Sequence, residues 1–352
     1  MKVLMVTFSD NADHQDTLFS MFEMVSARVC ATLLAIKNPK AAIERSDRVW
    51  LADCPKRPGV CAKTFNLPLL LRLIHRIRKE KFDAIYFESM HIWNLPVMIF
   101  AGKAKTYQVL HDVIPHEGDS QEKMVHLMNR MVCALADAIV LRNTKYIAQL
   151  SQSYGLPPEK IKYLELWRKY PAYTAPVHSG RILFFGRINP YKGIDNLLAI
   201  AKKCPGVQID VVGKASPQMK SAVEQLSALP NVKLKTGYVS NSEMKAAFVQ
   251  ADWVIVPYSS ASQSGVIIDA YKYSRPVVAF DVGAIAEQVE NRKSGYLVPA
   301  GDPDAFADCL HQALAMPADE YEKMTYYAYE YGSKKYAAGG AIERFLGLFA
   351  DG

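Results

Sequence analysis

Two cations in the second half of the chain are the first residues that could do chemistry. Arg187 and Lys192 stand five positions apart in the segment GRINPYKG. An arginine offers a planar fork of N–H groups and a lysine a compact charge, so together they suit a diphosphate. Taken alone, two ordinary cations on a solvated loop are the commoner explanation of such a pair.

A run of six small or polar residues and a glycine, 259–265, gives the pair a different meaning. Gln263, Ser264 and Gly265 provide polar groups and unhindered backbone N–H groups just before an apolar run, where a helix is expected to begin. The positive end of a helix attracts phosphate. Asp269 follows about one turn later, where it could accept hydrogen bonds from ribose hydroxyls; a solvent-exposed aspartate is the alternative. Both segments together predict a nucleoside diphosphate site.

Alternating strand and helix patterns must position these residues. In the second half we expect strands at 181–188, 207–213, 232–239, 253–258 and 276–283. Ligands of parallel sheets bind beyond the carboxyl ends of the strands, and Gly186 falls at such an end, where it permits close approach of the backbone to a ligand. A helix with Asp195 as its N-cap is expected to follow Gly193.

The first half shows the same alternation, which predicts two domains. We expect strands at 2–8, 84–89, 106–112 and 138–143, with helices at 67–80 and 121–136. The pattern breaks around 165–180, where prolines and a Ser-Gly pair indicate a linker. The prediction is an α/β protein with two doubly wound, Rossmann-like parallel-sheet domains, 1–172 and 173–352. The last helix, near 335–350, could pack back on the first domain.

Composition narrows the class of protein. The chain has 352 residues, half of them hydrophobic, so a folded protein is expected. Its six cysteines form no zinc or disulfide pattern, which favours free thiols in the cytoplasm. The first residues read as a strand and not as a signal peptide, and no apolar run reaches the roughly 18 residues of a membrane span.

The net charge of +7 comes from the first half. Residues 1–175 hold 24 Lys and Arg against 17 Asp and Glu, whereas residues 176–352 hold 18 of each. The 67–80 helix gathers basic residues beside a leucine-rich face, which suits either a packed helix with a solvated side or an interfacial helix that meets anionic lipid. These basic residues are Arg72, His75, Arg76, Arg78 and Lys79. No motif supports nucleic-acid binding.

The second half resembles the donor-binding domain of retaining GT-B glycosyltransferases of family 4. The resemblance covers most of 180–315 and is carried by GRINPYKGIDNLLAIA, VVGKA, NVKLKTGYVSNSEMKAAFVQADWVIVPY and SQSGVIIDAYKYSRPVVAFDVGAIAEQVENRKSGYLVPAGDPDAFADCL. It implies two domains that face a cleft, a nucleotide-sugar donor and no metal or other cofactor. By this resemblance Gly186-Arg187 and Lys192 bind the diphosphate and have the catalytic charge, and Asp269 binds ribose. Tyr238 and Val239 would lie at the base.

One departure from the family bears on sugar specificity and on activity itself. Relatives commonly carry two glutamates separated by seven residues around a Gly-Phe-Gly segment. Ala261 occupies the first of these places here and Asp269 the second. The carboxylate usually aimed at the donor-sugar hydroxyls is therefore absent, although the small residues still suit a phosphate site.

The first half resembles the acceptor-binding domain more weakly. His111 ends an expected strand and resembles the family histidine that faces the donor sugar from across the cleft, which makes it a catalytic candidate. Asp13 and His14, after the first strand, could touch the acceptor or the diphosphate, although a capped helix start explains them nearly as well. Glu88 is another strand-end candidate for the acceptor.

The expected function is that of a glycosyltransferase of the hexosyltransferase type. It would be retaining and metal-independent and would move a sugar from a nucleotide-diphosphate sugar to a glycan or lipid-linked acceptor, in surface-polysaccharide or glycolipid assembly. It would act in the cytoplasm, with a place at the inner face of the membrane if the 67–80 helix binds lipid. A nucleotide-sugar 2-epimerase is an alternative, and so is a non-catalytic nucleotide-sugar-binding subunit, because of Ala261.

Overall fold

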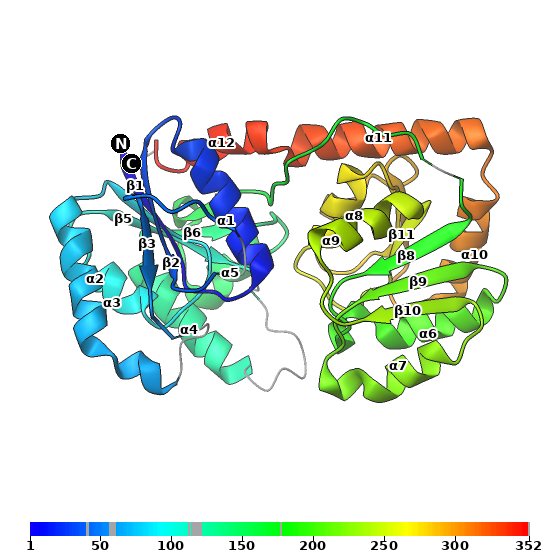
Figure 1. The fold of residues 1–352 in the computed structure, drawn as a ribbon, viewed down its shortest axis with the longest axis horizontal. Coiled ribbons are helices and arrows are strands. Elements are labelled where there is room, and N and C mark those ends of the chain that lie inside the picture. Colours follow the sequence, from blue (N-terminus) through cyan, green and yellow to red (C-terminus); the bar gives the residue numbers. More distant parts are fainter. Residues whose placement is uncertain (40–41, 56–60, 112, 114–121, 177, 351–352) are drawn as a thin grey trace. The chain divides into compact units, whose positions relative to one another are not determined.

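A computed structural model describes residues 1–350 except 40–41, 56–60, 112, 114–121 and 177 (Figure 1). The chain forms two compact units, Met1–Leu166 with Ala338–Gly352, and Trp167–Ala337. The first crossing between the units falls six residues before the expected boundary at 172. The chain then returns to the first unit at Ala338, so that the carboxyl-terminal segment is part of that unit.

The first unit contains a seven-stranded sheet in the order β3-β2-β1-β4-β5-β6-β7, with every pairing parallel. The strands are β1 (Lys2–Thr7), β2 (Cys30–Ile36), β3 (Val49–Ala52), β4 (Ala84–Phe87), β5 (Lys105–Leu110), β6 (Ala138–Leu141) and β7 (Ile161–Tyr163). All residues of β4 and β6 are buried, because helices cover both faces of a parallel sheet.

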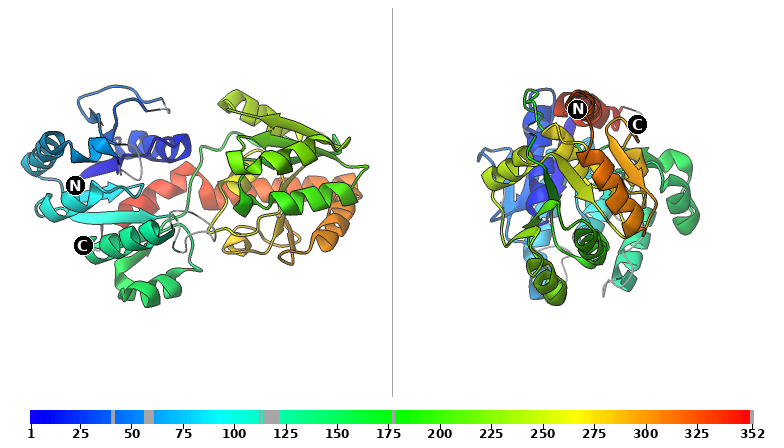
Figure 2. Two further views of the ribbon diagram at one scale, coloured as in Figure 1. Left: turned by 90° about the horizontal axis from the view of Figure 1, so that it is seen from below. Right: turned by 90° about the vertical axis from the view of Figure 1, so that its right-hand side faces the viewer.

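Helices pack on both faces of this sheet (Figures 1 and 2). They are α1 (Ala12–Val25), α2 (Leu67–Glu80), α3 (Asn94–Phe100), α4 (Glu122–Leu135), α5 (Ile147–Tyr154) and α12 (Ala338–Gly347). Helices α2 and α3 share one buried cluster with the sheet, and α4 and α5 share another. Helix α12 contacts α1, and its Phe345 and the following Phe349 pack edge-on against Tyr86 and Tyr107 of the sheet.

Helix α2 packs its leucine-rich face into the core of the first unit. The Asn66 side chain accepts a hydrogen bond from the Leu69 N–H and caps the helix. The apolar side chains recur at helical spacing and are buried: Leu70, Leu73, Ile74 and Ile77. This face is therefore not available to a lipid surface, and only Leu67 and Leu71 of the helix are exposed large apolar side chains.

The second unit contains a six-stranded sheet in the order β10-β9-β8-β11-β12-β13, also parallel throughout. The strands are β8 (Arg181–Phe185), β9 (Gln208–Gly213), β10 (Val232–Thr236), β11 (Trp253–Val256), β12 (Val277–Phe280) and β13 (Gly295–Val298). The strand order reverses between β8 and β11. Such a reversal is the switch point at which doubly wound sheets bind their ligands.

Helices α6, α7 and α10 lie on one face of the second sheet, and α8, α9 and α11 on the other (Figures 1 and 2). Their bounds are α6 (Ile194–Lys203), α7 (Lys220–Ser227), α8 (Asn241–Gln250), α9 (Gly265–Lys272), α10 (Pro303–Leu314) and α11 (Ala318–Tyr336). The Ser240 hydroxyl and the Glu243 carboxylate form a capping box at the start of α8. Helix α11 packs along α9.

Candidate functional site

Two glycines let the carboxyl ends of β8 and β9 approach each other closely. Gly186, directly after β8, has φ 115°, and Gly213, the last residue of β9, has φ 157°. A Cβ atom on Gly213 would lie 1.7 Å from the Gly186 carbonyl oxygen, so only glycine fits there. A Cβ on Gly186 would meet Val266 of α9 at 3.6 Å. Gly186 therefore lies between the end of β9 and helix α9.

Hydrogen bonds connect the loop 187–193, which contains Arg187 and Lys192 and is called the cation loop below, to the segment after β11. Gly193 has φ 70°, and a Cβ there would lie 1.8 Å from the Pro257 carbonyl oxygen. That oxygen accepts a hydrogen bond of 3.0 Å from the Asn196 amide. The Ser259 N–H donates to the Tyr191 carbonyl oxygen at 3.0 Å. The two segments singled out in the sequence are therefore neighbours within one unit.

The expected helix cap in this loop is wrong. Helix α6 begins at Ile194, and its N-cap is Gly193 and not Asp195. Gly193 takes that place because it adopts a left-handed conformation that an L-residue strains to reach. Asp195 is exposed in the first turn, where its charge still favours the positive end of the helix.

The two cations differ in their surroundings. The Arg187 side chain is exposed, whereas Lys192 is half-buried at the end of a single 3₁₀ turn, Pro190–Lys192. The Lys192 ammonium lies over the Tyr258 ring, 3.9 Å from its centroid, which is close enough for a cation–π contact. Tyr258 is fully buried, and burial raises the pKa of its phenol, so the ring stays neutral beneath the lysine.

Ser264 lies at the start of α9, but its polar groups are bonded within the protein and not free for a phosphate as expected. Its backbone N–H donates to the Gln288 side-chain oxygen at 2.6 Å, and its hydroxyl lies 3.4 Å from the Tyr258 hydroxyl. Ser264 is also buried, so it braces the helix start and does not offer its own groups to a phosphate. The first-turn N–H groups that remain for an anion begin at Gly265. Gln263 is half-buried just before them.

Asp269 is buried, so the solvent-exposed alternative is wrong. Its side chain is 11% exposed and pairs with Arg168, whose Nε lies 2.8 Å from Oδ1. The sequence analysis missed Arg168 because it falls in the expected linker, where no periodicity indicates which way a side chain points. The aspartate itself remains at the expected place, one turn into α9.

Two further positions of the second unit bear on the expected donor site: the segment after β10, and Ala261, which stands where relatives commonly carry a glutamate. Gly237 has φ 123°, and Tyr238 follows it with its side chain 84% exposed, while Val239 is half-buried. An exposed aromatic ring beyond a strand end can stack on a base. Ala261 is buried, and its carbonyl oxygen accepts a hydrogen bond from the Ala284 N–H.

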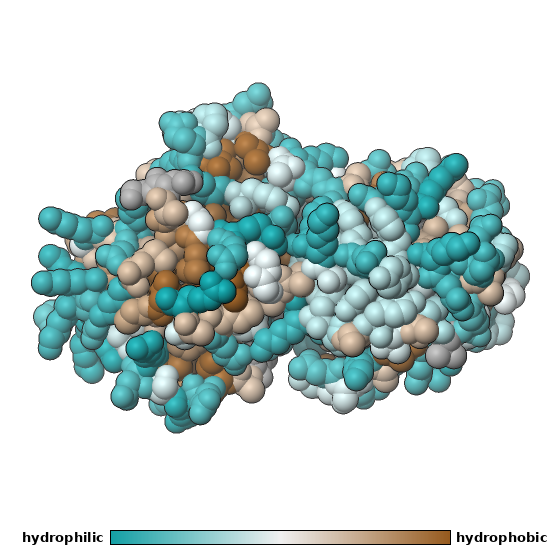
Figure 3. Space-filling model, turned by 90° about the horizontal axis from the view of Figure 1, so that it is seen from above, coloured by the Kyte–Doolittle hydropathy of each residue, from teal (hydrophilic) through white to brown (hydrophobic). Residues whose placement is uncertain are grey.

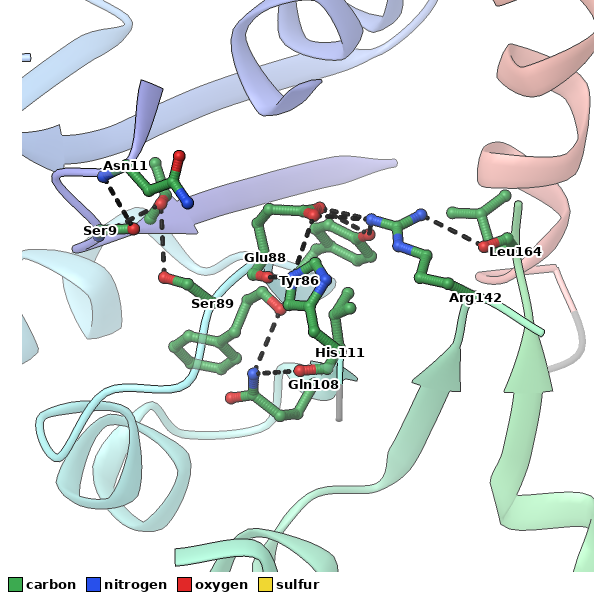
Figure 4. Close-up of polar contacts among 12 residues, drawn as sticks. Ser9, Asn11, Tyr86, Glu88, Ser89, Gln108, His111, Arg142 and Leu164 are labelled. Carbon is green, nitrogen blue, oxygen red and sulfur yellow. Dashed lines mark hydrogen bonds and ion pairs between the residues drawn. The ribbon is translucent and has the colours of Figure 1, made fainter. Parts of the chain in front are cut away.

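In the first unit, Glu88 follows β4 and forms a buried ion pair (Figure 4). One guanidinium nitrogen of Arg142 lies 2.7 Å from both carboxylate oxygens, and the Tyr86 hydroxyl donates to the same carboxylate at 3.0 Å. Burial opposes the charge on Arg142, but Glu88 and Tyr86 together outweigh it and raise the pKa of the guanidinium. Because Glu88 is fully buried, the structure favours a positioning role over the acceptor contact expected from the sequence.

His111 lies beside this pair (Figure 4). Its Nε2 is 2.8 Å from the Glu88 carbonyl oxygen, which can only accept, so Nε2 carries the proton. The imidazole stacks on that of His14 from α1, with centroids 4.5 Å apart and planes 5° from parallel. The structure thus brings His14 and His111 together. The Asp13 side chain lies outside the described residues.

Small polar residues surround the histidines at the same edge of the first sheet. The Thr7 hydroxyl lies 3.4 Å from that of Ser89, and the Asn94 amide donates to Gln108 at 2.8 Å. Gln108 and Asn94 are fully buried, so these bonds stiffen the strand ends beneath His111. The sequence analysis did not single out this network, because its members are scattered over four elements.

Metal-binding groups, cysteines and long apolar helices are considered next for the residues that the structure describes. Within this part of the chain, no group of three or more His, Cys, Asp and Glu residues could hold a metal ion. All six cysteines are among the described residues and are free thiols. None of the described helices combines the length and apolar character needed to span a bilayer.

Two parallel doubly wound sheets, each with its polar strand ends at one edge, define a GT-B fold. Known structures agree: an Anabaena protein, HepE, solved in complex with UDP and glucose, has a TM-score of 0.77 at 17% identity over 99% of both chains. Sucrose-phosphate synthase from Thermosynechococcus elongatus has a TM-score of 0.78 at 15% identity, covering 100% of this chain and 98% of its own. At these identities the likeness concerns the fold.

A family model matches most of the second unit. Residues 179–316 match the model of glycosyl transferases group 1.

Curated proteins are similar to part of the chain. A D-inositol 3-phosphate glycosyltransferase of Segniliparus rotundus is 30% identical over 237 residues, which make up 61% of this chain and 53% of the relative. An uncharacterized protein of the cps region of Klebsiella pneumoniae is 23% identical over 265 residues, 69% of this chain and 72% of its own. The chain spans about half the length of the first of these relatives.

Proposed function

We propose that this protein is a retaining, metal-independent glycosyltransferase that takes its sugar from a nucleotide-diphosphate sugar. The observation that carries the proposal is the junction of two segments in one unit: the loop with Arg187 and Lys192 is hydrogen-bonded to the segment that leads into α9. Cations and helix N–H groups then converge at the switch point of a parallel sheet. The UDP complexes of HepE and the activity named for the Segniliparus relative support the same reaction class.

Charge development explains why these groups would accelerate the reaction. When the sugar leaves the nucleoside diphosphate, negative charge builds on the β-phosphate, and fixed positive groups stabilise it. Arg187 is exposed and can reach a bound diphosphate, while Lys192 is held above Tyr258. These two cations and the N–H groups from Gly265 onward would do what a divalent ion does in other transferases.

The nucleoside end of the donor would lie against the residues that flank this site. Asp269 would accept hydrogen bonds from the ribose, and Tyr238 with Val239 would contact the base. On the first unit, we propose that His111 and His14 face the reacting sugar and the acceptor. The Glu88 main chain holds the His111 ring by a hydrogen bond of 2.8 Å.

The acceptor we propose is a glycan or a lipid-linked glycan of surface-polysaccharide or glycolipid assembly. The Klebsiella relative from a cps region points in this direction. Several large apolar side chains on or beside α2, α3 and α4 of the first unit are exposed: Phe65, Leu67, Leu71, Ile99, Phe100, Leu127 and Leu135. The face of the first unit seen in Figure 3 also carries hydrophobic patches. Together with the basic residues of α2, such a surface suits a protein of the cytoplasm that binds the anionic inner face of the membrane.

Ala261 favours a second candidate, a nucleotide-sugar-binding subunit without catalysis. The residue is buried and has no group to hold the hydroxyls of the donor sugar. An epimerase has less support, because it needs ionisable groups poised for proton transfer. The carboxylates of Glu88 and Asp269 are instead each paired with an arginine.

Two measurements separate these candidates. Thermal unfolding with UDP-, GDP-, ADP- and dTDP-sugars identifies the donor, since a ligand at 100 times its dissociation constant stabilises by about 2.7 kcal/mol. With that donor, a transferase releases nucleoside diphosphate only when membrane lipid extract or glycan acceptors are added, and does so equally well in EDTA. Binding of the donor without release under any acceptor would support the non-catalytic subunit, and loss of turnover in EDTA would contradict metal independence.

A further inference from the structure

Arg168 is held in place from several directions within the second unit. Its backbone N–H donates to the Tyr336 carbonyl oxygen at 2.9 Å, and it forms an isolated β-bridge with Ala337. Its Nη1 donates to the Trp167 carbonyl oxygen at 3.0 Å. The residue therefore joins the first segment of the unit to the last, and its side chain has little freedom.

The guanidinium of Arg168 spans the first turn of α9. Its Nε lies 2.8 Å from Oδ1 of Asp269, and its Nη2 lies 3.5 Å from Oδ2. The same Nη2 is 3.1 Å from the place that a Cβ atom on Gly265 would occupy. One side chain thus contacts the carboxylate of Asp269, which is proposed to bind ribose, and reaches Gly265, the first residue of α9.

The segment around Arg168 fits tightly between α9 and α11. The Tyr170 hydroxyl donates to the Ile268 carbonyl oxygen of α9 at 3.3 Å. A Cβ on Gly332 of α11 would lie 2.6 Å from that hydroxyl and 2.5 Å from Cβ of Tyr271. The Arg168–Asp269 pair is therefore part of a packed layer, unlike an ion pair between mobile surface side chains.

We propose that Arg168 is a positioning residue for the donor nucleotide and acts through Asp269. The inference rests on the proposed donor site. An aspartate is one methylene shorter than the glutamate that relatives carry at this place, so the direction of its carboxylate matters more. Arg168 fixes that direction through Oδ1, and Oδ2, at the longer distance, remains able to accept from a ribose hydroxyl. Without the arginine, the buried carboxylate would lose the partner that fixes its direction.

This role differs from two others that the same contacts allow. If Arg168 bound the phosphates directly, its loss would weaken pyrophosphate and nucleotides alike. If the pair only stabilised the fold, its loss would lower the unfolding temperature and leave affinity unchanged. A role through Asp269 predicts a loss confined to ligands that contain ribose.

The experiment compares calorimetric titrations of pyrophosphate and of whichever nucleoside diphosphate among UDP, GDP, ADP and dTDP binds the parent protein best. We expect Arg168→Ala to weaken the nucleotide by at least tenfold, about 1.4 kcal/mol, and pyrophosphate by less than twofold. Arg168→Lys keeps the charge without the fork and should recover part of the loss. Arg181→Ala is the matched control, because Arg181 forms a similar two-pronged pair with Asp210, from the opposite end of β8.

A double variant tests whether Arg168 acts through Asp269. Adding Arg168→Ala to Asp269→Asn should weaken nucleotide binding by less than a further twofold. The losses are not additive because Arg168 acts only through the Asp269 carboxylate. Fully additive losses, equal losses for pyrophosphate and nucleotide, or an unchanged nucleotide affinity in Arg168→Ala would each overturn the inference. If none of the four nucleoside diphosphates bound the parent protein, the proposed donor site itself would be wrong, and this inference with it.

Discussion

At the scale of single residues, the proposed reaction depends on two cations that have different surroundings, Arg187 and Lys192. Lys192 lies over the ring of the buried Tyr258, whereas Arg187 is exposed. Both would stabilise charge on a leaving group, so both should affect the rate more than the fold.

Removing either cation should slow turnover. We expect Arg187→Ala and Lys192→Ala each to lower kcat about a hundredfold or more, because a charge aimed at the developing oxyanion is lost. Lys202→Ala, an exposed lysine in the last turn of α6, is the control and should leave the rate unchanged. Steady-state kinetics with the identified donor decide the matter, and parent-like rates in both site variants would remove these residues from the mechanism.

A buried histidine should make the first unit sensitive to acid. Nε2 of His91 donates to the Pro55 carbonyl oxygen at 2.9 Å, and Nδ1 accepts from the Trp93 N–H at 3.1 Å, so the ring is neutral. Burial lowers its pKa to about 4 from an ordinary value of 6.5. The unfolded chain takes up the proton first, so folding stability is retained above pH 6.5 and lost as the pH falls towards 4, by about 3 kcal/mol.

Unfolding by urea between pH 7 and pH 5 measures this loss. We expect the midpoint to fall with pH in the parent protein and in His75→Gln, whose histidine is exposed on α2, and to fall less in His91→Gln. An NMR titration in which the His91 imidazole protonates near pH 6.5 would contradict the argument.

At the scale of elements, the donor site depends on how closely the cation loop approaches the end of β11. Gly193→Ala should separate the two, because its Cβ would collide with the Pro257 carbonyl oxygen and its backbone conformation would be strained. We expect weaker binding of nucleoside diphosphate by tenfold or more, measured by calorimetry. Gly206→Ala, where nothing lies within 4 Å, is the control. Equal affinities in the two variants would show that the loop can bind a diphosphate without this contact.

Helix α2 allows a test of the membrane surface that spares the core. Arg76 packs over the Trp50 ring at 3.8 Å and should be left alone. Changing Leu67 and Leu71 to Ser, with Arg72 and Lys79 to Glu, should abolish binding to vesicles rich in phosphatidylglycerol while the unfolding temperature stays within a few degrees. Cosedimentation measures the binding. If the parent protein did not sediment with these vesicles, the exposed apolar and basic residues would be surface without a lipid partner.

Most elements near the site were predictable, because strands and helices of a doubly wound sheet have distinct periods. Ser264 was placed correctly at the start of α9, yet its groups bind Gln288, a partner 24 residues away that no local pattern indicates. Arg168 was missed for the same reason. Its partner Asp269 is 101 residues away, and the segment around it has no period.

At the scale of the whole molecule, the two units were predicted, but their boundaries required tertiary contacts. The linker composition indicated a change near 172, whereas contacts to Tyr336 and Ala337 assign residues 167 onward to the second unit. A last helix near 335–350 was expected to pack back on the first domain, and α12 lies in the first unit. The long helix α11, which precedes it, was not expected.

The central claim is that the donor binds at the cation loop and the start of α9, and hydrogen exchange tests it most directly. Amide exchange followed by mass spectrometry, with and without a saturating nucleotide sugar chosen by thermal shift, locates the protected segments. If the donor binds there, amides in 187–193 and 262–268 of the parent protein should exchange more slowly with the ligand bound. In Lys192→Ala, this protection should be lost at the same ligand concentration. Protection confined to other segments, or none in a protein that binds the ligand, would contradict it.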